Sequence, residues 1–371
     1  MFQQSWLKRR SWLMVILIIV GIISVGFTMH NQRFYHRPVA KIVKTVTVGK
    51  PRRTSDQFKN VDYQHDQRLT AVMLNSRYRG RHLILNNTYS DSQPMDQRFR
   101  VGNQVFLSQL HDHNGTLSAN IAGYKRDVIL VVLAWLVIFL LLVMMGKAGS
   151  WALTSVVVNA LLFMFAVTLD LHNNGEHILA IFSILTVIFA FVSLLLVLGP
   201  NKKMLATFSA TVIGTFAALG VSLLVFSWTH ERGIYYESMQ YVTQVPRPLF
   251  LAETLLGSLG AVMDESSDII ATLFELKQLE PEVTSRRLFM SGRNVGKSIM
   301  GPLINVLFLI FMADTFTSSL LYIKNGNSWG YTFAMNMSLG TVQSLVSGIG
   351  IVLAVPLVSA FGAFLLGRRT K

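Results

Sequence analysis

Long apolar runs are the feature that most limits the folds open to this chain. Several of them reach the ~18 residues that mark a membrane-spanning helix. Seven runs are clear, and an eighth, at 248–274, is interrupted by acidic residues. The predicted spans are 12–27, 128–145, 151–169, 178–198, 204–228, 248–274, 298–323 and 341–366. We therefore expect an α-helical polytopic membrane protein with about eight transmembrane helices.

Composition agrees with this class and excludes others. Only 14% of the residues are charged, whereas soluble domains carry about 25%. Cysteine is absent, which excludes a disulfide framework, a thiolate metal site and a thiol nucleophile. No Ser/His/Asp arrangement is discernible either, so we expect no enzyme, no cofactor and no metal site.

Basic residues in the short loops predict the orientation. Lys8, Arg9 and Arg10 precede the first span, and no small-x-small cleavage site follows it, so residues 1–29 are predicted to be an uncleaved anchor. Lys and Arg accumulate in cytoplasmic loops. Eight spans with the N-terminus inside make every cytoplasmic segment basic, and they place both termini in the cytoplasm of a cell-membrane protein. The remaining cytoplasmic basic residues are Lys147, Lys202, Lys203, Lys277, Arg286, Arg287, Arg293, Lys297, Arg368, Arg369 and Lys371.

A polar, basic segment at 30–127 separates the anchor from the seven-helix membrane domain at 128–371. It holds 16 Lys or Arg against 7 Asp and no Glu. Residues 42–48 alternate and are rich in β-branched side chains, and 69–74, 82–86 and 104–110 are predicted to be further short strands. We expect a small extracytoplasmic β-barrel-like domain of about five strands.

The basic surface of this domain has two interpretations. It can bind anionic lipid head groups or an anionic wall polymer, or it can be an ordinary solvated face. Basic residues without interleaved aromatic residues argue against nucleic acid as a partner. The lipid bilayer itself is the partner that the spans require.

One helix face in the weak span combines small residues with carboxylates. Glu253, Gly257, Gly260, Asp264 and Asp268 are spaced by 4, 3, 4 and 4 residues, so they share a face. Glycines let helices approach closely in lipid, which explains Gly257 and Gly260. A carboxylate at mid-bilayer costs roughly 2.5–3.5 kcal/mol, so a polar partner is expected to face the acids.

Depth identifies that partner. Asp264 lies ~6 Å from the predicted centre of its span at 1.5 Å per residue, and Asn305 on the next span lies ~5 Å from its own centre, on the same side. We expect Asn305 to hydrogen-bond Asp264. Arg293 or Lys297 is expected to pair with Glu265 near the cytoplasmic interface. Asn159, mid-span in the third helix, is a less certain member of the site.

The same stretch resembles a known family. The segments 257–264, 275–277, 287–296 and 299–301 are similar to the signature of the YibE/F-like family, and Asn305 matches the family's helix Asn. The resemblance implies a polytopic bacterial membrane protein, here the longer YibE-type member, with a shorter YibF-type membrane protein as partner. The chain departs from the pattern at 296–298, where Gly-Lys-Ser replaces the family's Gly-Arg-Asp, so any role of that Asp is not carried over.

Two classes of function remain open. The first is a secondary transporter or permease, in which Asp264, Asn305, Asp268, Glu253 and Asn159 bind the substrate or ion. In this hypothesis the glycines on these helices, including Gly301, serve helix packing. The second is a non-transporting membrane scaffold or sensor whose basic extracytoplasmic domain binds a partner protein or an anionic envelope component.

Overall fold

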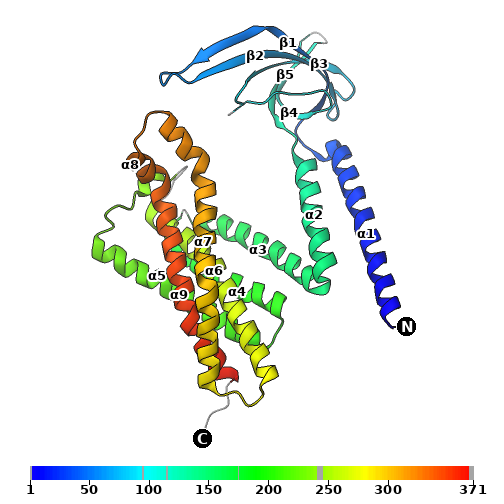
Figure 1. The fold of residues 1–371 in the computed structure, drawn as a ribbon. Helices are drawn as coiled ribbons and strands as arrows, with labels where there is room; N and C mark the ends of the chain where they lie inside the picture. Colours follow the sequence, from blue (N-terminus) through cyan, green and yellow to red (C-terminus); the bar gives the residue numbers. More distant parts are fainter. Residues whose placement is uncertain (1, 94–95, 114–115, 174, 240–244, 367–371) are drawn as a thin grey trace. The chain divides into compact units, whose positions relative to one another are not determined.

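The structure is a computed structural model that describes residues 2–93, 96–113, 116–173, 175–239 and 245–366. The chain divides into two compact units, Met1–Gly149 and Ser150–Lys371 (Figure 1). The predicted basic residues Arg368, Arg369 and Lys371 lie outside the described residues. Each unit is described by itself below.

The first unit joins two helices to a small sheet. Helix α1 (Phe2–His30) leads through the 3-10 turn η1 (Asn31–Phe34) into the sheet, and α2 (Asp127–Met145) leaves it. The strands are β1 (Val39–Ser55), β2 (Val61–Met73), β3 (His82–Ser90), β4 (Gln104–His113) and β5 (Thr116–Tyr124).

The strands follow the order β1-β2-β3-β5-β4. The pairs β1–β2, β2–β3 and β4–β5 are antiparallel, β1 pairs β4 through Val39–Lys41, and β3 pairs β5 in parallel at two positions. Alternate residues enter the core, which includes Ala40, Ile42, Leu69, Ala71 and Leu85. The predicted β domain is confirmed as a small five-stranded sheet.

A polar joint ties both helices to the sheet. The Lys125 ammonium is almost fully buried, lies 2.9 Å from the Asp127 carboxylate and donates to the Thr28 carbonyl oxygen at 2.8 Å. The Tyr35 hydroxyl donates to Asp127 at 2.8 Å. Burial, together with the nearby Asp127 carboxylate, raises the pKa of Tyr35. The Asn75 amide donates to the carbonyl oxygens of Gln32, Tyr35 and Arg37 and accepts from the Val39 amide.

The second unit is helical. Its elements are α3 (Lys147–His172), α4 (Ile178–Leu198), α5 (Lys202–Thr229), η2 (Tyr236–Ser238), α6 (Pro246–Leu279), α7 (Ser285–Lys324), α8 (Trp329–Thr332), the π-helix η3 (Phe333–Met337) and α9 (Ser338–Leu366). Local signals fix several ends. Asn201 and Thr284 cap α5 and α7 with side-chain oxygens that accept backbone N–H groups, and Pro246 starts α6.

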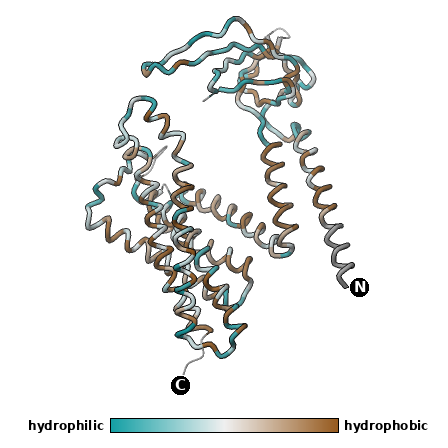
Figure 2. The backbone as a smooth tube through the Cα atoms, viewed as in Figure 1, coloured by the Kyte–Doolittle hydropathy of each residue, from teal (hydrophilic) through white to brown (hydrophobic). Residues whose placement is uncertain are grey.

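Seven helical segments of the described residues are long and apolar enough to cross a membrane, which indicates a multi-pass membrane protein. They are Met14–Phe34, Asp127–Met145, Lys147–His172, Ile178–Leu198, Lys202–Thr229, Ser285–Lys324 and Trp329–Leu366. Hydrophobic residues run along these helices (Figure 2). Many of their large apolar side chains are exposed, and no residue of α2 is buried. Such a surface suits lipid rather than water.

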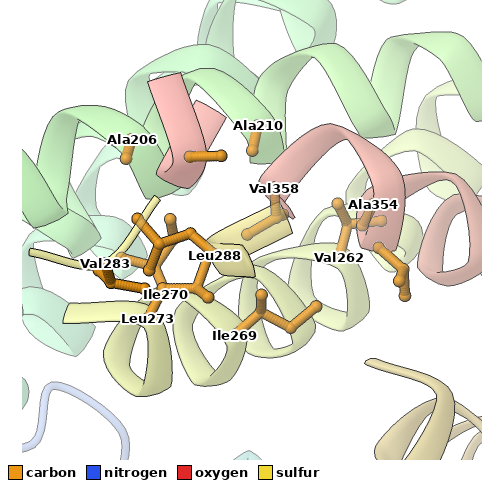
Figure 3. Close-up of a cluster of buried hydrophobic side chains, with 12 residues drawn as sticks. Ala206, Ala210, Val262, Ile269, Ile270, Leu273, Val283, Leu288, Ala354 and Val358 are labelled. Carbon is orange, nitrogen blue, oxygen red and sulfur yellow. The ribbon is translucent and has the colours of Figure 1, made fainter. Parts of the chain in front are cut away.

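The predicted eighth span, α6, is not among these seven. Its acids Glu253, Asp264, Glu265 and Asp268 lower its apolar character. It nevertheless lies at the middle of the second unit, where it packs against α4, α5, α7 and α9. Figure 3 shows one core cluster around it, to which α6 contributes Val262 and Ile269, α5 Ala210 and α9 Ala354, with Val262 next to Ala354.

Small residues bring three helices together in this core. A β-carbon at Gly214 of α5 would lie 3.1 Å from Val262 of α6, and one at Gly350 of α9 would lie 2.7 Å from the same side chain. Helices α5, α6 and α9 therefore approach at the level of Val262 as closely as side chains allow.

Candidate functional site

A cavity of about 950 Å³ lies within the second unit. Helices α3, α4, α6 and α7, the π-helix η3 and the first turns of α9 contribute its lining. Three acidic residues, Asp170, Glu253 and Asp314, are among those that line this space, together with Asn336 and Gln343. No lysine, arginine or histidine stands among the described residues that line it. The cavity is therefore built for positive charge.

Each carboxylate reaches the cavity from a different helix. Asp170 is in the last turn of α3 and is buried, with 6% of its surface exposed. Glu253 is on the second turn of α6, and Asp314 interrupts the apolar part of α7; both are exposed. Three acids from three helices converge only because α3, α6 and α7 surround the same space.

Aromatic rings make up much of the remaining wall. They come from Phe163, Phe182, Phe250, Phe311 and Tyr322. The negative face of an aromatic ring attracts cations, most strongly where water is excluded. The aromatic wall and the acidic residues thus both favour a cation as the ligand.

The π-helix η3 positions Asn336 on this wall. The Asn336 amide donates to Ser319 Oγ at 2.8 Å and to the Thr315 carbonyl oxygen at 3.3 Å, and its oxygen accepts from Ser318 Oγ at 3.0 Å. All three partners are on α7, next to Asp314. Single π turns within α-helices occur frequently at functional sites, and this one locks η3 onto α7.

The acid face of α6 begins in the cavity and continues away from it. Glu253 lines the cavity, and one turn later Gly257 lies against Gln343, a second lining residue. Gly260, Asp264 and Asp268 follow on the same face, and all of these positions are exposed. The opposite face of α6 is the buried one, through Leu255, Leu259, Val262, Ile269 and Leu273.

Several predicted contacts are wrong. Asp264 and Asn305 are both exposed, and the hydrogen bond predicted between them is not found among the described contacts, because the two side chains lie on outward faces of their helices. A β-carbon at Gly260 or Gly301 would meet nothing within 4 Å, so neither glycine serves close helix packing within this chain. The binding roles assigned to Asp264, Asn305 and Asp268 stay predictions.

The predicted pairing of Glu265 is also wrong. Residue 265 is one position beyond Asp264, which turns it by about 100° into the interior. It is 1% exposed, and neither carboxylate oxygen has a hydrogen-bond partner. The Arg293 guanidinium instead lies over the Phe289 ring, 5.9 Å from its centroid, and Lys297 is exposed.

Asn159, the less certain member of the predicted site, is held within the helices. Its amide donates to Ser193 Oγ of α4 at 2.7 Å. It does not line the cavity, so it serves the contact between α3 and α4.

The sequence interpretation missed Asp170, Asp314, Asn336 and Gln343. Asp314 carries the signal that singled out Asp264, an acid within an apolar run. The amides carry no comparable signal, because Asn and Gln are common at helix ends.

Two family models match the chain. The model described as YibE/F-like protein matches residues 133–368. The model described as YibE/F family N-terminal domain matches residues 33–124. No curated protein and no solved structure matches.

Proposed function

This chain belongs to the YibE/F-like family, and from that premise we propose that it is a secondary transporter or permease whose cavity binds a small organic cation. The observation that carries the proposal is the cavity of about 950 Å³ with three carboxylates and no basic side chain among its described lining residues. Cavities of about 300–1,000 Å³ are of the size that holds small molecules.

The charge of the cavity selects the ligand class. The described lining holds three acidic side chains and no basic one, so a positive ligand is stabilised there. The aromatic rings Phe250, Phe311 and Tyr322 offer flat faces to the non-polar part of such a ligand. An organic ammonium ion meets both requirements, whereas an anionic solute would meet three like charges.

The acid face of α6 supplies the route in this proposal. Glu253 belongs to the cavity, and Asp264 and Asp268 continue along the same face. The sequence interpretation assigned Asn305 to a binding site with Asp264. A row of exposed acids offers successive weak sites to a cation, as conduction requires.

The finer topology belongs to the same proposal. Helix α6 is the eighth span, both termini are cytoplasmic, and the five-stranded sheet closes as a barrel outside the cell membrane. A shorter YibF-type protein is the proposed membrane partner. Support for α6 as a span comes from its 34 residues and from its position among α4, α5, α7 and α9.

A transport assay tests the function. The full chain is reconstituted in liposomes, with and without its proposed partner, and the uptake of a panel of radiolabelled organic cations and anions is measured. Cation uptake that is lost in Asp314→Asn supports the proposal. Uptake of anions alone, or full cation uptake by Asp314→Asn, would refute the cavity as the binding site.

A scaffold or sensor function has its own supporting observation. The β1–β2 hairpin carries exposed basic side chains at Lys44, Lys50, Arg52, Arg53 and Lys59. Such a surface favours anionic lipid or a wall polymer by charge. Replacing Lys50, Arg53 and Lys59 by Gln in the full chain should then weaken salt-sensitive binding to anionic vesicles, and unchanged binding would count against this role.

A further inference from the structure

Glu265 is a buried carboxylate that the proposed cavity does not use. It is on α6, only 1% of its surface is exposed, and neither of its oxygens has a hydrogen-bond partner. A buried charge without a partner is strongly unfavourable, and proteins pair such charges or use them to hold ions. A proton or a bound cation can neutralise such a carboxylate, and the oxygen atoms around it decide between the two.

Buried hydroxyl groups without partners occur in the same helices. Thr207, Thr211 and Thr215 repeat at every fourth residue of α5, are fully buried and make no hydrogen bond through their hydroxyls. Ser266, next to Glu265, is also fully buried, and its hydroxyl makes no hydrogen bond. Buried hydroxyls in helices usually donate to the carbonyl four residues earlier, as Thr186 does to Phe182. These hydroxyl oxygens are free to face a ligand.

The helix register brings the two sets to one level. Ala206 and Ala210 of α5 pack with Ile269 and Ile270 of α6, whereas Leu219 and Phe226 pack with Phe250, Leu251 and Leu255, so α5 and α6 are antiparallel. Gly214 is opposite Val262. Because the helices are antiparallel, one turn back from Gly214 on α5 lies at the same level as one turn forward from Val262 on α6. Thr211 is therefore level with Glu265 and Ser266.

We propose that Glu265, Ser266 and Thr211 form a binding site for one dehydrated sodium ion. Hard cations take oxygen ligands, which carboxylates and hydroxyls supply. A single carboxylate among neutral hydroxyls balances one positive charge, which selects a monovalent ion over a divalent one. No described residue of this site lines the cavity, so sodium binding here stands apart from the proposed transport of an organic cation.

Two measurements on the purified full-length protein test the site. Equilibrium binding of radioactive sodium gives the affinity, and thermal unfolding is compared in sodium and in N-methylglucamine at equal ionic strength and pH. Sodium should raise the melting temperature, because a ligand that binds only the folded state stabilises it.

Variants assign the effect to residues. Glu265→Gln should abolish saturable sodium binding and raise the melting temperature in sodium-free buffer, because it removes an unpaired buried charge. Thr211→Val, which keeps the shape and removes one oxygen ligand, should weaken sodium binding by about tenfold. Thr186→Val and Glu275→Gln are the matched controls, because the first removes a hydroxyl already bonded to its own helix and the second an exposed carboxylate. Both should bind sodium as the unchanged protein does.

Three outcomes would overturn the proposal. They are no saturable sodium binding by the unchanged protein, undiminished binding by Glu265→Gln, and an equal loss in Thr186→Val and Thr211→Val. If Glu265→Gln fails to fold, sodium binding by Thr211→Val compared with that by Thr186→Val still tests the site. None of these outcomes depends on whether the protein transports an organic cation.

Discussion

The side-chain nitrogen of Gln343 lies 2.7 Å from the point where a β-carbon at position 257 would stand. No real β-carbon tolerates such a contact, so glycine at 257 is what lets the Gln343 amide lie against α6. Because Gln343 also lines the carboxylate cavity, the two residues connect the acid face of α6 with the proposed binding site.

Gly257→Ala should therefore change ligand binding more than stability. The contacting atom is the end of a flexible side chain, so Gln343 can turn away and the change in unfolding free energy should stay below about 1 kcal/mol. Cation uptake should fall several-fold in liposomes. Gly220→Ala is the matched control, because a β-carbon there meets nothing within 4 Å. Equal uptake by both variants would contradict the role of Gln343.

Asn336→Leu should destabilise the protein by about 1–3 kcal/mol, because it leaves the buried Ser319 hydroxyl without its amide partner. Asn336→Asp keeps the acceptor for Ser318 but turns a carboxylate oxygen toward the Thr315 carbonyl oxygen, so it should also destabilise the protein. Chemical unfolding measures both losses. Unchanged stability in both variants would show that η3 is not held through this side chain.

Asp264→Asn tests the acid face of α6. The side chain is exposed and makes no hydrogen bond or ion pair with the described residues, so stability should change by no more than about 0.5 kcal/mol. Flux of the cationic substrate should fall. Flux equal to that of the unchanged protein would remove Asp264 from the proposed route.

Lys125→Met should destabilise the first unit strongly. The change leaves Asp127 without its ion-pair partner and the Thr28 carbonyl without a donor. Breaking a buried pair costs about 3–5 kcal/mol, and the partial exposure of Asp127 reduces the expected loss to about 2–4 kcal/mol. The exposed pair Arg52–Asp66 is the control, where Arg52→Gln should cost less than about 1 kcal/mol. Thermal unfolding compares the two.

The stability of the sheet should depend on pH through Asp62. The Ser92 hydroxyl donates to the Asp62 carboxylate and holds its pKa below the usual 3.8. A lowered pKa in the folded state contributes stability above the unfolded pKa, and this contribution is lost as the pH falls through the folded pKa. Ser92→Ala should therefore raise the pKa of Asp62 and shift acid unfolding to higher pH, whereas Ser92→Thr should not. A titration of the Asp62 carboxyl by NMR measures both.

The sequence predicted the class of the fold and strands of the sheet, because both depend on local pattern. Alternation over 42–48 and 69–74 predicted the strands, whereas the face of α6 expected to meet a polar partner is exposed and the opposite face enters the core. These signals are periodic and lie within one element.

The site was harder to predict because it depends on how helices meet. Asp264 and Asn305 have matching depths, but depth along a helix does not say which way the side chain points, and both face outward. Asp170, Glu253 and Asp314 come from three helices, and no spacing within one helix reveals their convergence. Glu265 could have been found, since its position relative to Val262 and Ile269 already places it on the buried side.

The joint at Lys125, Asp127 and Asn75 has a mechanical consequence. The chain enters the sheet through the end of α1 and leaves it through the start of α2, and the side chains of this joint bond to both connections. A force applied to the sheet is thereby transmitted to both helices, at the end of α1 and the start of α2. A swing of α1 on its connection breaks the hydrogen bond from Lys125 to Thr28, and a swing of α2 breaks the ion pair between Lys125 and Asp127, so the sheet and the two helix ends move together.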